Sequence, residues 1–144
     1  MFEHFLKYQN GEINGCPSFK KALHEITVNK KKLSHWIWYI VPYDFPSLTH
    51  QDVFVLQERN VKFYIENHTL RNNYIDIMNA IYILLRNTDI YKFDTIISRT
   101  DLKKIYGSAT LFKNNIDPSE NKIINICQKI IVLLDLYNTH RKLK

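Results

Sequence analysis

The residue types best suited to ligand chemistry gather in one short stretch, Leu33–Pro42. It holds both tryptophans of the chain, Trp36 and Trp38, with His35 and Tyr39 beside them. Aromatic side chains can stack on a planar base, an interaction worth roughly 1–3 kcal/mol per base. An imidazole can exchange a proton near neutral pH. The stretch is therefore the first candidate for a site that binds a base-containing ligand.

The same tryptophans also have a purely structural interpretation. A buried aromatic ring removes about 150–250 Å² from water, and its loss typically costs about 3–5 kcal/mol of stability. We therefore expect at least one of Trp36 and Trp38 to be a core anchor. His35 is the better candidate for ligand contact, because its two ring nitrogens need partners in the protein or on a ligand. Both outcomes stay open.

A second polar cluster lies far along the chain. Asp101 and Lys104 stand three residues apart, and Ser108 and Thr110 follow Gly107. Lys104 and the two hydroxyls could form a small anion-binding corner, because exposed N–H groups and hydroxyls at a turn suit a phosphate. Alternatively, Asp101 and Lys104 are an ordinary surface pair worth about 0.2–0.5 kcal/mol. Spacing alone favours the pair.

Several catalytic and cofactor motifs are absent from the sequence. With glycine only at Gly11, Gly15 and Gly107, the chain contains neither a GxGxxG dinucleotide loop nor a Walker A loop. It has no GxSxG nucleophile elbow. Its six histidines show no HExxH motif and no paired His and Cys spacing of the kind that binds zinc. We therefore predict no metal site and no bound cofactor.

Length and composition indicate one globular domain, residues 1–144. A chain of 144 residues with 45% hydrophobic content is long enough to bury a core without disulfides. The net charge of +6 invites a polyanion, but the lysines are spread along the chain and no nucleic-acid-binding motif is present. A generally basic, solvated surface is the favoured interpretation, and nucleic-acid binding stays open.

The cellular location is inferred from what the sequence lacks. The two cysteines, Cys16 and Cys127, do not make a disulfide framework, which favours a reducing compartment. The start of the chain shows no signal-peptide pattern. The longest aliphatic run, Ile130–Leu134, is far shorter than the ~18 residues of a membrane span. We expect an intracellular, cytoplasmic protein with no membrane partner.

The elements that must position both clusters are predicted to be helices. We predict helices over Met1–Gln9, from an N-cap at Ser18, and over Val61–Glu66. Apolar residues at a spacing of three to four predict a long core helix through Leu70, Tyr74, Ile77, Met78, Ile81, Leu84 and Leu85. The fold class is therefore mainly α, a compact multihelical single domain.

Three local patterns refine this expectation. The tryptophan stretch favours a helix, but it is apolar on both faces, so one short strand pair with Asp52–Leu56 stays open. Thr100 is predicted to cap a brief helix over Asp101–Tyr106 that ends at Gly107 in a left-handed conformation. Asp117–Glu120 has the pattern of a capping box that begins the last helix.

On these motifs the chain resembles an uncharacterised family, DUF1810. The family has a motif like SHWMW, an aromatic or aliphatic pair and Pro-Gln, which Ser34–Pro42 resembles with Tyr43 in place of Gln. Its Asp-x-x-Lys and Ser-Ser-Met-Thr-Leu-Phe motifs resemble Asp101, Lys104 and Gly107–Phe112, with glycine at a serine position.

Further matches extend the resemblance over most of the chain. Phe5 and Gln9 resemble family residues of the first helix, and Ala22–Glu25 resembles an Ala-Leu-x-Glu motif. Asn67–Asn73 replaces a His-Pro-x-Leu-Gly-x-Arg motif, so Asn73 stands at the arginine position. If the missing Gln or Arg serves a reaction in relatives, that reaction is lost or altered here. The resemblance implies a mainly α-helical domain and supplies no established activity.

A looser similarity, that of a compact helical domain with polar and tryptophan residues in one place, is to the NADAR class that processes ADP-ribose derivatives. It is an analogy at the level of fold. The aromatic, histidine, lysine and acidic residues clustered in the two motifs motivate the hypothesis of a pocket for a nucleotide or ADP-ribose-type ligand, with N-glycosidic hydrolysis as the reaction if the protein is an enzyme. The candidate catalytic residues are Glu25, His35 and Asp101. The candidate ligand-binding residues are Gln9, Trp36, Trp38, Lys104, Ser108 and Thr110.

Two other hypotheses stay open. The aromatic stretch and the basic surface could bind another protein, which would make the chain a non-enzymatic interaction module. Net charge alone could bind nucleic acid non-specifically. The ligand-pocket hypothesis makes the sharpest structural demand, because it requires the two clusters to fold side by side around an open hollow.

Overall fold

The computed structural model describes residues 1–45 and 52–142, and the regular structure in these ranges is helical. The α-helices are α1 (Glu3–Gln9), α2 (Phe19–His24), α3 (Ile37–Ile40), α4 (Val61–Glu66), α5 (His68–Arg86), α6 (Phe93–Ile96), α7 (Arg99–Asn114) and α8 (Asn121–Lys142). Single turns of other helix types are η1 (Glu25–Asn29), η2 (Asp52–Phe54), η3 (Glu58–Asn60) and η4 (Ile90–Lys92). The mainly α fold class is confirmed.

The strand pair that the sequence left open does not form in the described residues. Residues of the tryptophan stretch make the helix α3, in which Ile40 N–H donates to the Trp36 carbonyl, and Asp52–Phe54 is a 3-10 turn. These backbone groups are satisfied within the segment, so they need no partner strand.

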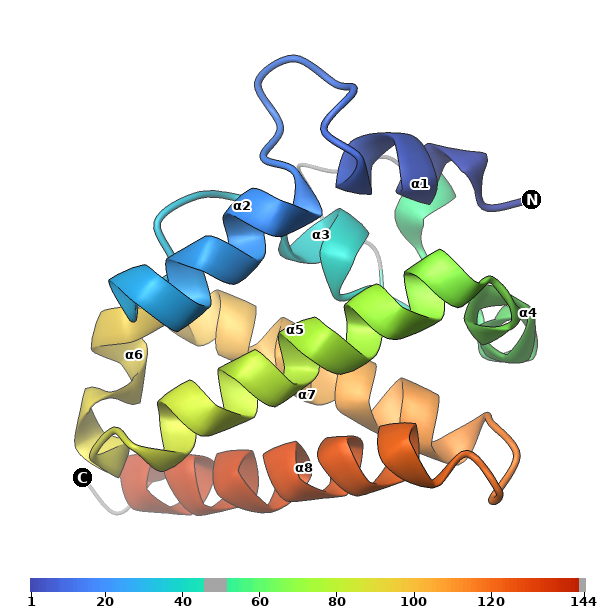
Figure 1. Ribbon diagram of the computed structural model, residues 1–144. Coiled ribbons are helices and arrows are strands. Elements are labelled where there is room, and N and C mark those ends of the chain that lie inside the picture. Colours follow the sequence, from blue (N-terminus) through green and yellow to red (C-terminus); the bar gives the residue numbers. More distant parts are fainter. Residues whose placement is uncertain (46–51, 143–144) are drawn as a thin grey trace.

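The long helix α5 runs through the middle of the molecule. In Figure 1 it crosses in front of α7, with α8 along one side and α1, α2 and α3 on the other. All seven residues of its predicted apolar stripe are buried in one continuous hydrophobic cluster. The periodicity was sufficient for this prediction because one turn of helix brings residues three and four apart onto the same face.

The second helical segment begins where the sequence predicts and ends in an unusual way. The Ser18 hydroxyl accepts a hydrogen bond of 3.1 Å from Lys21 N–H, which confirms the N-cap. After α2 the chain continues as one π-helical turn, η1, and Lys30 then adopts a left-handed conformation with φ 57°. This reversal directs the following backbone back towards Glu25.

Two predicted helix boundaries are wrong. The helix α7 begins after Ser98, whose hydroxyl accepts from Asp101 N–H at 3.2 Å, and it continues through Gly107 to Asn114. Gly107 is needed for close packing, because a Cβ atom there would lie 2.8 Å from Cε1 of Phe45. A contact from a distant segment therefore explains the glycine, and no helix end is required.

The predicted capping box at Asp117–Glu120 also does not begin a helix. The Asp117 carboxylate accepts from Ser119 N–H at 2.8 Å, within a local turn, and α8 starts at Asn121. The Glu120 carboxylate forms an ion pair of 2.5 Å with Arg71 of α5. Its side chain is thus committed to a neighbouring helix.

No helix in the described ranges is long and apolar enough to cross a lipid bilayer.

Candidate ligand-binding pocket

The two polar-aromatic clusters meet at one pocket of about 290 Å³. One wall comes from the segment that leads into α3, and the other comes from the first turns of α7. The lining residues are Lys32, His35, Trp36, Ile37, Trp38, Ser98, Thr100, Asp101 and Lys104. The structure therefore brings together five of the residues that the sequence analysis selected: His35, Trp36, Trp38, Asp101 and Lys104.

The first wall is held by the carboxylate of Glu25, which lies behind the pocket and does not line it. Its Oε1 accepts hydrogen bonds from Leu33 N–H at 2.9 Å and Ser34 N–H at 3.2 Å. The same oxygen accepts from Nε1 of the Trp36 indole at 2.9 Å, and the Ser34 hydroxyl donates to Oε2. Four donors on one side chain hold the loop and the indole in place.

These hydrogen bonds determine the charge of the group. Burial favours the neutral form and by itself would raise the pKa of Glu25, which is only 3% exposed. The hydrogen bonds from Ser34, Trp36 and Leu33 favour the ionised form more strongly, so the pKa lies below its ordinary value of 4.5. Glu25 is therefore ionised at neutral pH and is poorly suited to act as a general acid.

The two walls are joined by an ion pair between Lys32 and Asp101. Nζ of Lys32 lies 2.9 Å from Oδ2 of Asp101, and the side chains are only 5% and 16% exposed. The same ammonium group donates to the Ser34 carbonyl and lies 5.0 Å from the centre of the Trp36 ring. The predicted pairing of Asp101 with Lys104 is replaced by this pairing across the pocket.

The two tryptophans have different environments. Trp36 is fully buried, which confirms that at least one of the two is a core anchor. Trp38 is half-buried and packs edge-on against Tyr8 and Phe54, with ring centres 5.3 and 4.7 Å apart. His35 is exposed at the mouth of the pocket. Trp38 and His35 are therefore the aromatic groups that a ligand can reach.

Lys104 is the cation in the pocket whose charge is available. It is half-buried, and its Nζ lies 5.6 Å from the centre of the Tyr43 ring. No carboxylate of the described residues lies within ion-pair distance of it. Because the charge of Lys32 is offset by Asp101, Lys104 gives the described lining of the pocket a net positive charge.

Three predicted ligand-binding residues lie elsewhere. The Gln9 side chain is buried, donates to the Tyr39 carbonyl at 2.8 Å and accepts from Asn73 at 2.9 Å. Ser108 is fully buried, with its hydroxyl 3.0 Å from that of Tyr74. Thr110 lines a separate hollow together with Gly107. The predicted anion-binding corner does not form, because α7 stays helical through these residues.

Three polar lining residues were missed by sequence reasoning, together with the apolar Ile37. The sequence assigned Lys32 to the end of the second helix and Thr100 to a helix cap, and it placed Ser98 at the end of an irregular or short helical segment. The Lys-x-Ser-His order of residues 32–35 was an available signal for Lys32, since it places a cation next to the aromatic motif. In the described part of the chain, no group of three or more His, Cys, Asp or Glu side chains is placed to hold a metal ion.

The fold and the pocket together define a class: a mainly α protein whose aromatic, basic and acidic side chains meet in one pocket. The chain belongs to the DUF1810 family, because the profile of that family, described as a protein of unknown function, matches residues 2–132. No curated protein and no solved structure shows a significant match to the chain. The family resemblance is thus confirmed, and the similarity to the NADAR class stays an analogy.

Two departures from the family pattern meet in space. Tyr43, at the glutamine position, packs on Phe45 with ring centres 4.4 Å apart, and Phe45 occupies the space beside Gly107. Glycine at a serine position thus accompanies an aromatic pair next to Lys104. The third departure, Asn73, donates to Gln9 in the core.

Proposed function

We propose that the pocket between the tryptophan stretch and α7 binds the nucleoside or mononucleotide part of a nucleotide or ADP-ribose-type ligand. One observation carries the proposal: His35, Trp38, Lys104 and Asp101 converge on a single hollow. Its volume of about 290 Å³ is close to the lower limit of ordinary ligand pockets, about 300–1,000 Å³. A base with its ribose and one phosphate suits this space better than a whole dinucleotide.

Each reachable side chain has a role in this binding mode. Trp38 and His35 offer an aromatic surface and hydrogen-bonding nitrogens to the base. Lys104 offers a charge to a phosphate, and a charge-assisted hydrogen bond to it is stronger than a neutral one. Glu25 does not line the pocket, and its role is to position Trp36 and the backbone that carries His35.

If the pocket is catalytic, its chemistry is N-glycosidic hydrolysis. Asp101 would accept a proton from water as the water oxygen bonds to the anomeric carbon. The C–N bond would break with its electron pair on the base, and His35 would protonate the leaving nitrogen. Lys32 would hold the Asp101 carboxylate in place for this role.

Binding is tested by calorimetry and thermal shift with AMP, ADP-ribose and NAD. We expect saturable binding that Lys104→Ala weakens about tenfold, since a hydrogen bond to a charged group is worth about 1.5–3 kcal/mol. The matched control is Lys122→Ala, which removes the same charge from an exposed position at the start of α8, outside this pocket. Equal losses for the two variants, or no ligand that binds at all, would contradict the proposal.

Hydrolysis is tested separately, by chromatography of the base released from ligands that bind. Release should stop in Asp101→Asn while binding persists, with circular dichroism to show that the variant is folded. Binding without release would leave a ligand-sensing or interaction role and remove the catalytic one.

A further inference from the structure

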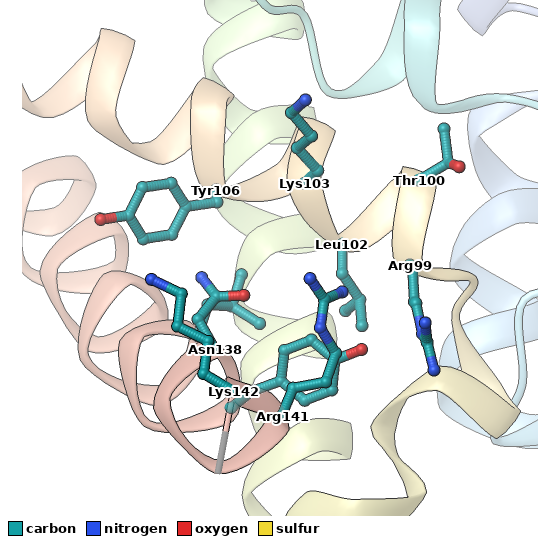
Figure 2. A pocket seen from close by; sticks show the side chains of 10 residues that line it. Arg99, Thr100, Leu102, Lys103, Tyr106, Asn138, Arg141 and Lys142 are labelled. Atoms are coloured by element: carbon teal, nitrogen blue, oxygen red, sulfur yellow. The ribbon is translucent and has the colours of Figure 1, made fainter. Parts of the chain in front are cut away.

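A second hollow, of about 460 Å³, lies between the first half of α7 and the end of α8. Figure 2 shows side chains of both helices around it: Arg99, Thr100 and Lys103 come from α7, and Asn138, Arg141 and Lys142 come from the last turns of α8. The two helices pack against each other, and the start of α7 lies beside the end of α8. Cations that are some forty positions apart in sequence thereby share one cleft. We call this hollow the basic cleft.

The basic cleft carries four cationic side chains and no carboxylate among its lining residues. The cations are exposed, and they are Arg99, Lys103, Arg141 and Lys142. Two acidic groups contact lining residues of the cleft, and one of them forms an ion pair with Arg99. Among the described residues, no carboxylate pairs with the other three cations. Asp94 accepts hydrogen bonds of 3.2 Å from Nε of Arg99 and from the Tyr137 hydroxyl, and Asp135 accepts from the Tyr106 hydroxyl at 2.9 Å.

The floor of the basic cleft is apolar and is part of the hydrophobic core. Leu102, Leu134 and Tyr137 line it and are buried in the core. The guanidinium of Arg141 lies 5.8 Å from the centre of the Tyr137 ring, a cation–π distance. Because an apolar floor lies beneath long cationic side chains, the cations gather at the rim, where an anionic ligand meets them.

The basic cleft shares lining residues with two neighbouring hollows. Thr100 also lines the proposed ligand pocket. Arg99, Tyr137 and Arg141 also line a third hollow, of about 500 Å³, together with Tyr91, His140 and the acidic Asp94. The three residues shared with the third hollow extend the basic cleft on that side, which suits an elongated ligand better than a compact one.

We propose that the basic cleft binds the phosphate backbone of a single-stranded nucleic acid. A strand with a charge on every nucleotide fits a continuous concave path lined with cations, and such grooves are how proteins follow a single-stranded backbone. A lipid surface is the other common polyanion, but it is flat, so it would touch the rim and leave the concave space of about 460 Å³ beneath it unfilled. This inference does not depend on the proposed nucleotide pocket.

The test uses the full chain and a fluorescein-labelled oligouridylate, with anisotropy measured between about 50 and 200 mM salt. If the three cations without a carboxylate partner contact phosphates, log K should fall against log[salt] with a slope of about −2, at roughly 0.7 per contact. The variant Lys103→Ala should reduce the slope by about 0.7, and Lys103→Ala with Arg141→Ala by about 1.4. The matched control is Lys122→Ala, an exposed lysine at the opposite end of α8, which should leave the slope unchanged.

The outcomes separate the possible partners. Equal effects of Lys103→Ala and Lys122→Ala would mean that net charge alone acts, and this would overturn the proposal. Binding to vesicles of phosphatidylserine and phosphatidylcholine without binding to the oligonucleotide would assign the cleft to a membrane surface and also overturn it. Lys104→Ala should weaken AMP binding but not oligonucleotide binding, so a failure of either proposal can be seen independently of the other.

Discussion

The carboxylate of Glu25 and the indole of Trp36 are joined by a hydrogen bond of 2.9 Å between Oε1 and Nε1. Eleven positions separate them in sequence. The π-helical turn η1 and the left-handed Lys30 reverse the chain between them, so that the carboxylate faces the loop that follows. π-Helical turns of this kind are frequent at functional sites. Here the turn supports one wall of the candidate pocket.

We expect Glu25→Gln to destabilise the protein by about 1–3 kcal/mol, measured by urea unfolding. An amide nitrogen would face N–H donors of the loop, and at least one buried donor would lose its acceptor. The matched control is Glu12→Gln, which makes the same change at an exposed position and should stay within about 0.5 kcal/mol of the parent. If the two variants were equally stable, Glu25 would have no positioning role.

The contribution of Glu25 should also depend on pH. Its pKa in the folded protein lies below the ordinary value of 4.5, so the folded state favours the ionised form. The stability gained is fully present above that ordinary value and is lost as the pH falls through the folded pKa. The difference in unfolding free energy between the parent and Glu25→Gln should therefore shrink when urea unfolding is repeated at decreasing pH below about 4.5. A difference that grew on acidification would have the wrong sign.

Cys127 should resist alkylation in the folded protein. It is fully buried in α8, and burial raises the pKa of its thiol to about 12, so almost no thiolate exists at neutral pH. Cys16 is only half-buried and should react first with iodoacetamide. Peptide mass spectrometry after labelling, with and without urea, distinguishes the two thiols. Fast labelling of Cys127 under native conditions would show that the core around α8 opens readily.

Gly107 should be replaceable only when Phe45 is also changed. A Cβ atom at position 107 would meet the Phe45 ring at 2.8 Å, so we expect Gly107→Ala alone to destabilise the protein by about 1–3 kcal/mol. In a Phe45→Ala background the same change should stabilise it by about 0.5–1 kcal/mol, because alanine is the better helix former. Thermal unfolding of the four proteins in this double-mutant cycle measures the coupling. Additive effects would rule out the contact.

Periodicity and local capping determined much of this fold from sequence alone. The buried stripe of α5 and the Ser18 cap depend on residues within a few positions of one another, so local reasoning found them. The end of α7 and the start of α8 involve contacts with distant parts of the chain instead. The glycine at position 107 is explained by the close approach of Phe45, and Glu120 forms an ion pair with Arg71. Neither partner can be recognised from local spacing.

The same division holds for the candidate sites. The sequence selected His35, the tryptophans, Asp101 and Lys104 because their chemistry is visible residue by residue. Only the tertiary structure placed them around one pocket, and it placed Glu25 behind that pocket as a support. It also gathered cations from α7 and α8 into the basic cleft, although they are dispersed along the sequence. Chain spacing specifies which face of a helix a residue occupies, whereas packing between helices decides which faces meet.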